Sequence, residues 1–270
     1  MRAIIGTIGA VLVLTGCGGT VTTEAAPASS APSAAPASTA VATPSPVVTG
    51  PNVSGCFTEK DGEIFTHGDG LPGVITGKGK VGVVITYERN GNVCTWRPLS
   101  DHLVAAGYRV LLYARPGRDY PDEVAAEMAE RLLKDVKRVF LVGGSMGATA
   151  SVPAAEKVAA KSAGKDAGKD AGKAGSRVAG VVALSGAIDE GDAARISFPL
   201  LQIGSENDAY GGATDLARAH DAATKAPDNE VHVVKGESLH ASALFGSPHG
   251  PQVLDWITDF MNRHAAPEKG

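Results

Sequence analysis

A serine stands among glycines at the end of an apolar run, in the sequence VFLVGGSMG of residues 139–147. The run is typical of a buried strand, and the Ala-rich segment after Gly147 is typical of a helix. A serine at the centre of Gly-x-Ser-x-Gly between strand and helix lies on a sharp turn whose neighbours tolerate almost no side chain. The spacing therefore predicts that the hydroxyl of Ser145 is an exposed nucleophile. The alternative is a plain Gly-rich turn.

A serine hydroxyl is a poor nucleophile at neutral pH, so it needs a general base and an acid that orients the base. Two residues follow later strand-like runs: Asp208 comes after the run that ends at Ile203, and His240 after the run that ends at Val234. The carboxyl ends of parallel strands lie at one edge of a sheet, so both could reach the serine. His249 is a second possible base, but it directly precedes the last predicted helix.

Strands and helices that could position these residues alternate along the chain. Strands are predicted at residues 81–86, 108–113, 139–142, 178–184, 198–203 and 230–234, and helices from about 98 to 106, 121 to 134, after Ser145, from about 214 to 225, and in an amphipathic segment at 253–261. The alternation predicts right-handed strand-helix-strand units and a parallel sheet. Two short runs at 63–66 and 73–76 predict a leading antiparallel hairpin. Only about a dozen residues separate Ser185 from the strand at Phe198, too few for a substantial lid.

From about residue 56 onward the chain resembles the α/β-hydrolase family. The matching marks are the GGSMG turn, Asp208, His240, and the run WRPL at 96–99 before GYRV at 107–110. The resemblance implies an α/β-hydrolase fold: a mostly parallel sheet with helices on both faces and little or no cap domain. It also implies a triad of Ser145 as nucleophile, His240 as general base and acid, and Asp208 orienting the imidazole. The main-chain N–H of Met146 would be one oxyanion donor.

The second oxyanion donor should come from the loop after the first central strand. Many relatives have His-Gly there, whereas this chain has Tyr87-Glu88 followed by Arg89, Asn90 and Gly91. Glu-x-x-Gly resembles the dienelactone-hydrolase branch, which implies the N–H of Arg89 as donor. That branch uses a cysteine nucleophile, so the resemblance extends to the loop and not to the substrate. Tyr87 and Glu88 are possible pocket residues, and Glu88 either points into the site or is a solvated loop carboxylate.

The first residues have the pattern of an export signal. Arg2 precedes an apolar stretch that is too short to span a bilayer, and Leu14-Thr15-Gly16-Cys17 resembles a bacterial lipobox. We expect a signal peptide at 1–16, a lipidated Cys17 that starts an Ala/Ser/Thr/Pro-rich disordered tether at 17–52, and a folded domain at 53–266 with a low-complexity surface insertion at about 161–176. The expected location is the outer face of the bacterial cell membrane. The alternative is an ordinary secretory signal.

The remaining cysteines, Cys56 and Cys94, form either a disulfide, as is common in exported proteins, or two free buried thiols. The formal net charge is −4 at pH 7, and no Lys/Arg cluster is interleaved with aromatic residues, so nucleic acid is not an expected partner. The histidines lie in no metal-like spacing, so neither a metal nor another cofactor is implied. The sequence does not indicate an oligomeric state.

Together these patterns predict a serine hydrolase that cleaves an ester or related acyl bond of a small molecule through an acyl-serine intermediate. An acyltransferase or a peptidase could use the same three residues. A protein of another class, a non-catalytic surface lipoprotein that uses the fold as a binding module, is also compatible with the sequence, because the Tyr87-Glu88-Arg89 loop departs from the common oxyanion pattern.

Overall fold

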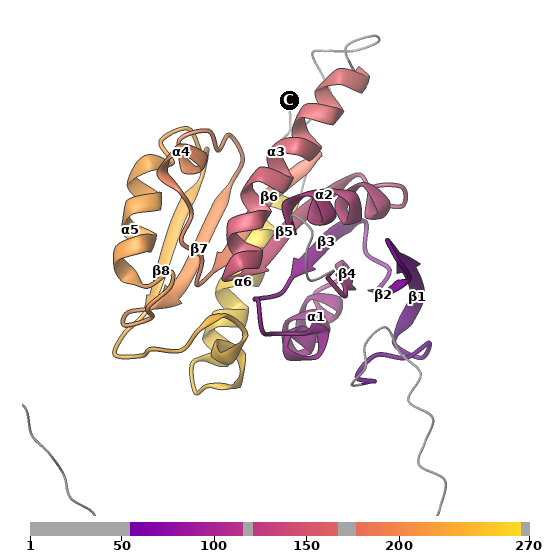
Figure 1. Cartoon of the computed structure of the whole chain (residues 1–270), viewed down its shortest axis with the longest axis horizontal. Helices are drawn as coiled ribbons and strands as arrows, with labels where there is room; N and C mark the ends of the chain where they lie inside the picture. The colour runs from indigo at the N-terminus through magenta and orange to yellow at the C-terminus, as the bar shows by residue number, and fades with distance from the viewer. Residues whose placement is uncertain (1–54, 116–120, 167–176, 266–270) are drawn as a thin grey trace, which may run out of the picture. The chain divides into compact units, whose positions relative to one another are not determined.

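A computed structural model describes residues 55–115, 121–166 and 177–265, and in them eight strands form one sheet in the order β1-β2-β4-β3-β5-β6-β7-β8 (Figure 1). The strands are β1 (Gly62–His67), β2 (Leu71–Thr76), β3 (Val81–Thr86), β4 (Arg109–Tyr113), β5 (Arg138–Gly144), β6 (Val178–Leu184), β7 (Leu200–Ser205) and β8 (Asn229–Val234). The predicted hairpin is β1 and β2, and β2 also pairs antiparallel with β4. The other neighbours are parallel, which confirms the predicted sheet.

Helices cover both faces of this sheet. The α-helices are α1 (Arg97–Ala105), α2 (Pro121–Leu132), α3 (Met146–Asp166), α4 (Glu190–Ala193), α5 (Ala213–Ala222) and α6 (Gly250–Ala265), and two 3₁₀ helices are η1 (Val93–Trp96) and η2 (Ala241–Gly246). Residues of α2, α3, α4 and α5 share one core cluster, and residues of α1, α6, η1 and η2 share the other. Figure 1 shows α2 and α3 as neighbouring helices.

The two clusters explain why the strands have continuous apolar sequences. In β5 the side chains of Val139 and Leu141 belong to the cluster under α2 and α3, whereas Phe140 and Val142 belong to the cluster under α1 and α6. Successive side chains of a strand point to opposite faces, so a strand covered on both faces needs an apolar residue at each position. Between β6 and β7 the short α4 is the only helix, in agreement with the expected lack of a large cap.

One helix is longer than the composition suggested. The low-complexity tract predicted at about 161–176 begins inside α3, which continues to Asp166. The buried hydroxyl of Ser162 donates to the carbonyl of Val158 at 2.8 Å, and Lys161 pairs with Glu130 of α2 at 3.5 Å. The first bond lies within α3, and the second reaches the neighbouring helix, so the helical start of the tract has contacts on both. The rest of the tract, the signal peptide, Cys17 and the tether lie outside the described residues.

Within the ranges that the structure describes, none of the helices has both the length and the apolar character needed to cross a membrane.

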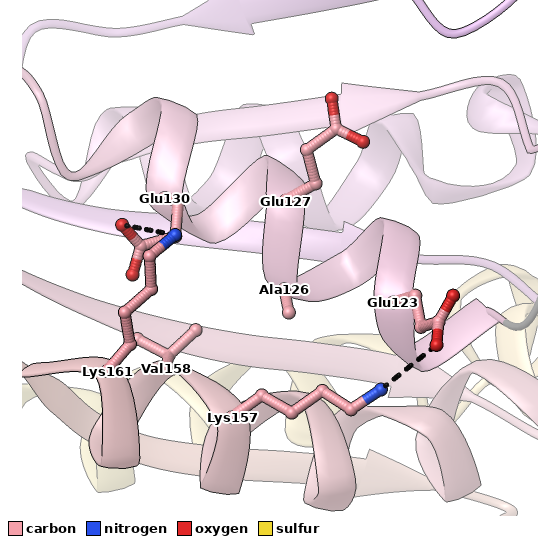
Figure 2. A pocket seen from close by; sticks show the side chains of 7 residues that line it. All are labelled: Glu123, Ala126, Glu127, Glu130, Lys157, Val158 and Lys161. Atoms are coloured by element: carbon pink, nitrogen blue, oxygen red, sulfur yellow. Dashed lines mark ion pairs between the residues drawn. The ribbon is translucent and has the colours of Figure 1, made fainter.

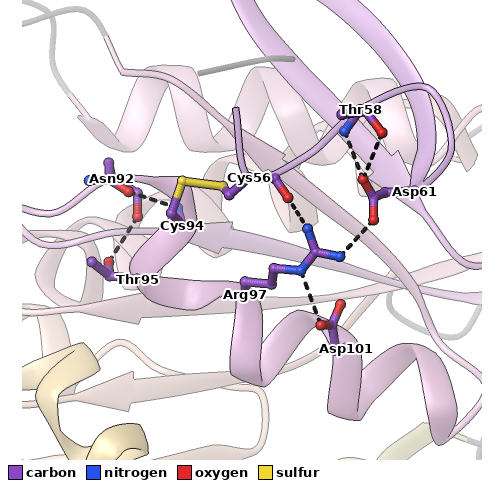
Figure 3. Close-up of a disulfide and its surroundings, with 8 residues drawn as sticks. All are labelled: Cys56, Thr58, Asp61, Asn92, Cys94, Thr95, Arg97 and Asp101. Atoms are coloured by element: carbon purple, nitrogen blue, oxygen red, sulfur yellow. Dashed lines mark hydrogen bonds and ion pairs between the residues drawn. A yellow bond between two sulfur atoms is a disulfide. The ribbon is translucent and has the colours of Figure 1, made fainter. Parts of the chain in front are cut away.

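A disulfide joins Cys56 to Cys94, with the two Cα atoms 5.7 Å apart (Figure 3). Of the two alternatives for these cysteines, the structure has the pair. The bridge fastens the segment before β1 to η1. Its neighbour Arg97 reinforces the same junction, because the guanidinium donates to the carbonyl of Cys56 and lies 2.6 Å from the carboxylate of Asp61. The start of the domain is thus fixed to the region between β3 and α1.

Asp61 is held in its ionised form at this junction. Burial alone would raise the pKa of its carboxyl, but hydrogen bonds from the main chain of Thr58 and from Arg97 outweigh burial and lower the pKa. The bond from the Thr58 amide is 2.7 Å long. A lowered pKa means that the interaction stabilises the fold at neutral pH and is lost as the pH falls through the lowered value.

Replacement of Cys56 and Cys94 by alanine is expected to lower the free energy of unfolding by about 2–4 kcal/mol, because the bridge closes a loop with a sequence separation of 38 residues. Urea denaturation of the folded domain would measure the difference. The reduced wild type should unfold like the double variant. Equal midpoints for the oxidised wild type and the variant would contradict a stabilising bridge.

Candidate active site

Ser145 occupies the junction between β5 and α3 in a strained conformation. Its φ is 53°, in the left-handed region that a residue with a side chain rarely adopts. Its amide donates to the carbonyl of Leu184 at the end of β6 at 2.8 Å, and its carbonyl accepts from the amide of Thr149 at 3.0 Å. In residues 139–148, Ser145 and Met146 are the two that are not buried. The predicted strand-turn-helix is therefore present, with the serine partly exposed.

The glycines around Ser145 are required by close packing. A Cβ atom at Gly143 would lie well under 3.0 Å from the carbonyl of Gly147, and one at Gly147 would lie equally close to the carbonyl of Thr86 at the end of β3. Gly144 is also restricted, because a Cβ there would meet the indole of Trp96. Real Cβ atoms do not approach other heavy atoms this closely, so the backbone of α3 can meet β3 only without side chains.

A Gly147→Ala variant is expected to lose about 2 kcal/mol or more of unfolding free energy, because the clash is with backbone atoms that cannot move aside. Alanine has the better helix propensity, which would otherwise favour this variant. Thermal and urea unfolding would measure the loss. Gly246→Ala is the matched control, since a Cβ at Gly246 meets nothing within 4 Å. A Gly147→Ala variant as stable as the wild type would contradict this packing.

Asp208 and His240, predicted from their places after β7 and β8, lie together. His240 Nδ1 is 2.8 Å from one carboxylate oxygen of Asp208 and 3.0 Å from the other. An ionised carboxylate only accepts hydrogen bonds, so this pairing places the imidazole proton on Nδ1 and leaves Nε2 as an acceptor. The Asp208 side chain is 4% exposed, whereas that of His240 is 34% exposed. Asp208 is thus shielded from water, while His240 remains accessible.

Three polar or packing contacts hold the His240 loop at the edge where Ser145 lies. Ser185, directly after β6, accepts a hydrogen bond from the amide of Ala241 at 2.9 Å. Ser205, the last residue of β7, donates to the carbonyl of Leu239 at 2.7 Å. The Cβ atom of Ala241 lies 2.9 Å from the position that a Cβ of Gly144 would take. The residues on both sides of His240 are therefore fixed to neighbouring strand ends, and one of them contacts the residue before Ser145.

Backbone strain is concentrated at this same edge. Among the described residues, the non-glycine residues with positive φ are Ser145 at 53°, Ser185 at 49° and Ala241 at 47°. Each such residue costs on the order of 1–3 kcal/mol and persists only where the surroundings determine it. All three belong to the contacts just described. Such clustering is typical of functional sites.

The loop after β3 runs beside the first turn of α3. A Cβ at Gly147 would come 3.0 Å from the carbonyl of Tyr87, so the Tyr87 backbone lies next to the helix start that contains Met146. The amide of Gly91 donates to the carbonyl of Glu88 at 3.1 Å and closes a turn in which Arg89 is exposed. The structure therefore brings the loop predicted to complete an oxyanion site to the same edge.

Arg115, which sequence reasoning did not single out, fixes this loop from the end of β4. Its amide donates to the hydroxyl of Tyr87 at 2.8 Å, and its guanidinium lies over the Tyr87 ring at 4.6 Å. The same guanidinium donates to the carbonyl of Glu88 at 3.0 Å. Tyr87 is consequently held by contacts at its ring and its hydroxyl.

The Glu88 carboxylate points inward. Oε2 accepts a hydrogen bond from the indole N–H of Trp96 at 2.6 Å, and Oε1 accepts from the hydroxyl of Ser242. The Glu88 carboxylate is therefore half-buried and bound by two side chains. No local pattern indicates this pairing, because Ser242 lies 154 residues from Glu88 along the chain.

Tyr210 is a further residue of the site that the sequence did not indicate. Its side chain is 71% exposed, the one large hydrophobic residue of the described chain so exposed, and its ring lies 6.3 Å from that of His240. Its amide donates to Asp208 Oδ1 at 3.1 Å. His249, the second candidate base, pairs instead with Glu237 at 3.4 Å. The geometry favours His240 over His249 as partner of Asp208.

A groove between α2 and α3 lies apart from these residues (Figure 2). It has a volume of about 410 Å³ and is lined by Glu123, Ala126, Glu127, Glu130, Lys157, Val158 and Lys161. At about 1.5 Å per residue, Lys157 is roughly 16 Å along α3 from Met146. The charged side chains that line the groove face one another, and Lys157 Nζ lies 3.7 Å from the carboxylate of Glu123. In the described residues, no group of three His, Cys, Asp or Glu side chains could hold a metal ion.

The chain belongs to the alpha/beta hydrolase family, whose sequence model matches residues 64–265. No match was found among curated proteins. Among solved structures, the chain is similar to the Pyrococcus furiosus esterase Pf2001, with a TM-score of 0.61 and 16% identity over 78% of this chain and 96% of that one. It is also similar to the monoacylglycerol lipase of Paleococcus ferrophilus, with a TM-score of 0.57 and 16% identity over 75% and 99% of the two chains. At such identities the likeness establishes the fold.

Proposed function

We propose that the protein is a serine hydrolase that cleaves an ester or related acyl bond through an acyl-Ser145 intermediate. The observation that carries the proposal is the hydrogen-bonded pair of His240 and the shielded Asp208, held at the sheet edge where Ser145 lies on its left-handed turn. This arrangement supports a triad made of these three residues. It also supports His240, rather than His249, as the general base.

In the proposed reaction, His240 Nε2 accepts the hydroxyl proton as Ser145 Oγ attacks the acyl carbon. The carboxylate of Asp208 stabilises the imidazolium that forms, and His240 then gives the proton to the leaving group. A water molecule, deprotonated by the same imidazole, attacks the acyl-enzyme and releases the acid and free Ser145.

The oxyanion would be stabilised by main-chain N–H groups. The amide of Met146 is the first of α3, and the first amides of a helix have no acceptor within the helix. We propose Met146 as one donor and Arg89, in the adjacent turn, as the other. Loss of such a donor typically costs about 10²-fold or more in rate.

The proposed substrate is a small or readily accessible acyl ester. Between β6 and β7 the described chain has α4 and no larger cap, and the exposed Tyr210 ring beside His240 offers an apolar surface at the rim. The family match and similarity to structures named as an esterase and a monoacylglycerol lipase support acyl ester chemistry as a proposal. No resident metal or organic cofactor enters this mechanism.

Labelling of the purified protein by a fluorophosphonate probe tests the nucleophile. We expect the probe to label the wild type and not to label Ser145→Ala. We also expect His240→Ala and Asp208→Asn to hydrolyse short acyl esters with a kcat lowered by about 10⁴-fold or more. His249→Ala is the matched control and should label normally. A wild type that does not label, or a Ser145→Ala variant that labels equally, would exclude the serine mechanism. Esters of increasing acyl length would then define the substrate.

We also propose that the chain is exported and anchored by lipid at Cys17 to the outer face of the bacterial cell membrane, on the basis of the sequence at 14–17. Expression of the full chain in a bacterial host should place it in the membrane fraction and in the detergent phase. Cys17→Ala should move it to the aqueous phase. Equal partitioning of the two proteins would contradict lipid anchoring.

A further inference from the structure

We propose that Glu88 is a positioning residue that ties the proposed oxyanion loop to the loop that carries His240. Its two carboxylate oxygens take hydrogen bonds from two different elements. Trp96 in η1 donates to Oε2 at 2.6 Å, and Ser242 in η2, two residues after His240, donates to Oε1. The consequence for catalysis rests on the proposed function, whereas the tie between the two loops can be tested without it.

Trp96 makes this tie rigid because its side chain is fully buried next to the turn that carries Ser145. Its indole fills the space beside Gly144, the residue before Ser145. On another side it packs edge-to-face on Phe245 of η2, with ring centroids 5.3 Å apart. The indole therefore contacts the serine turn and the helix that follows His240, and its one polar atom is satisfied by Glu88.

The element that carries Trp96 is fixed in turn. The amide of Cys94 donates to the side chain of Asn92 at 2.8 Å, which caps η1, and the disulfide holds Cys94 to Cys56 (Figure 3). Because η1 is capped by Asn92 and bridged to Cys56, Trp96 is a hydrogen-bond donor with a fixed position. A carboxylate bound to it has a fixed position.

The main chain of Glu88 is held as firmly as its side chain. Its carbonyl accepts from Arg115 Nη2 at 3.0 Å and from the amide of Gly91 at 3.1 Å. A Cβ at Gly91 would come 2.6 Å from Glu88 Cδ, so a side chain at this position would displace the carboxylate from its two donors. With both its carbonyl and its carboxylate fixed, Glu88 determines where the following amide, that of Arg89, can lie.

The contacts exclude a role for Glu88 as a second acid of the triad. His240 Nδ1 is already bound to Asp208, and both Glu88 oxygens are occupied by other donors. A glutamine could make the same tie without charge, because its oxygen can accept from Trp96 while its amide donates to Ser242, whose hydroxyl can also accept. An alanine cannot. These two substitutions therefore separate a geometric role from one that needs the charge.

The test measures kcat and KM for a short acyl ester in the wild type, Glu88→Gln and Glu88→Ala. The matched control is Asp228→Ala, which removes a carboxylate bonded to His264 at 2.7 Å just before β8, at the opposite edge of the sheet. We expect Glu88→Ala to lower kcat by about 10²-fold with little change in KM, since the loss is one of alignment in the transition state. Glu88→Gln should retain most of the activity, and the control should match the wild type.

Amide hydrogen exchange supplies a readout that is independent of activity. In Glu88→Ala, exchange should become faster at both residues 87–92 and residues 240–246, and it should stay slow in Glu88→Gln and Asp228→Ala. A Glu88→Gln variant as impaired as Glu88→Ala, or faster exchange in only one of the two loops, would overturn the proposal. If the wild type hydrolyses no ester, the proposed function fails, while exchange in the two loops still decides whether Glu88 ties them.

Discussion

The candidate site depends on a backbone contact between the start of α3 and the end of β3. Gly147 lies so close to the carbonyl of Thr86 that no side chain fits between them, and Gly143 is packed in the same way against Gly147. The chain turns sharply between these contacts, and Ser145 lies in the turn, partly exposed and in a left-handed conformation. It also places the loop after β3 beside Met146, which an oxyanion site requires. One close approach thus sets the geometry of both the proposed nucleophile and the proposed oxyanion donors.

The strain of this arrangement is offset by neighbouring strands. Ser145 is hydrogen-bonded to the end of β6, and Ala241 is bonded to Ser185, also at the end of β6. Ser205 at the end of β7 holds the residue before His240. Because parallel strands end at one edge of the sheet, each of these contacts comes from a rigid element. The loops are consequently positioned by the core.

The two core clusters, one on each face of the sheet, differ in how they contact the candidate site. The cluster under α2, α3 and α5 is mainly aliphatic and packs against one face of the sheet. The other cluster contains Trp96, Phe245 and the apolar face of α6, and it reaches the site directly through the indole bound to Glu88. The disulfide and Arg97 reinforce this second layer where η1 begins. Covalent and ionic reinforcement therefore lies next to the candidate site.

The sequence by itself determined the strands, the order of the sheet-edge residues and the turn at Ser145. These features have local signals in the sequence: continuous apolar runs, glycines that allow close approach, and polar residues just after strands. The positions of Asp208 and His240 followed from the last of these. The end of α1 was predicted at about residue 106, and the structure has a glycine with positive φ, Gly107, just beyond it.

Only the tertiary structure decided the rest. The inward direction of Glu88 depends on Ser242, 154 residues away, and the choice between a disulfide and free thiols depended on bringing Cys56 and Cys94 together across 38 residues. In the part of α3 that continues to Asp166, Lys161 pairs with Glu130 of α2, a residue of a different helix. Each is a contact between segments that no local pattern relates, since hydrogen bonds and packing are chosen by position in space and not by spacing along the chain.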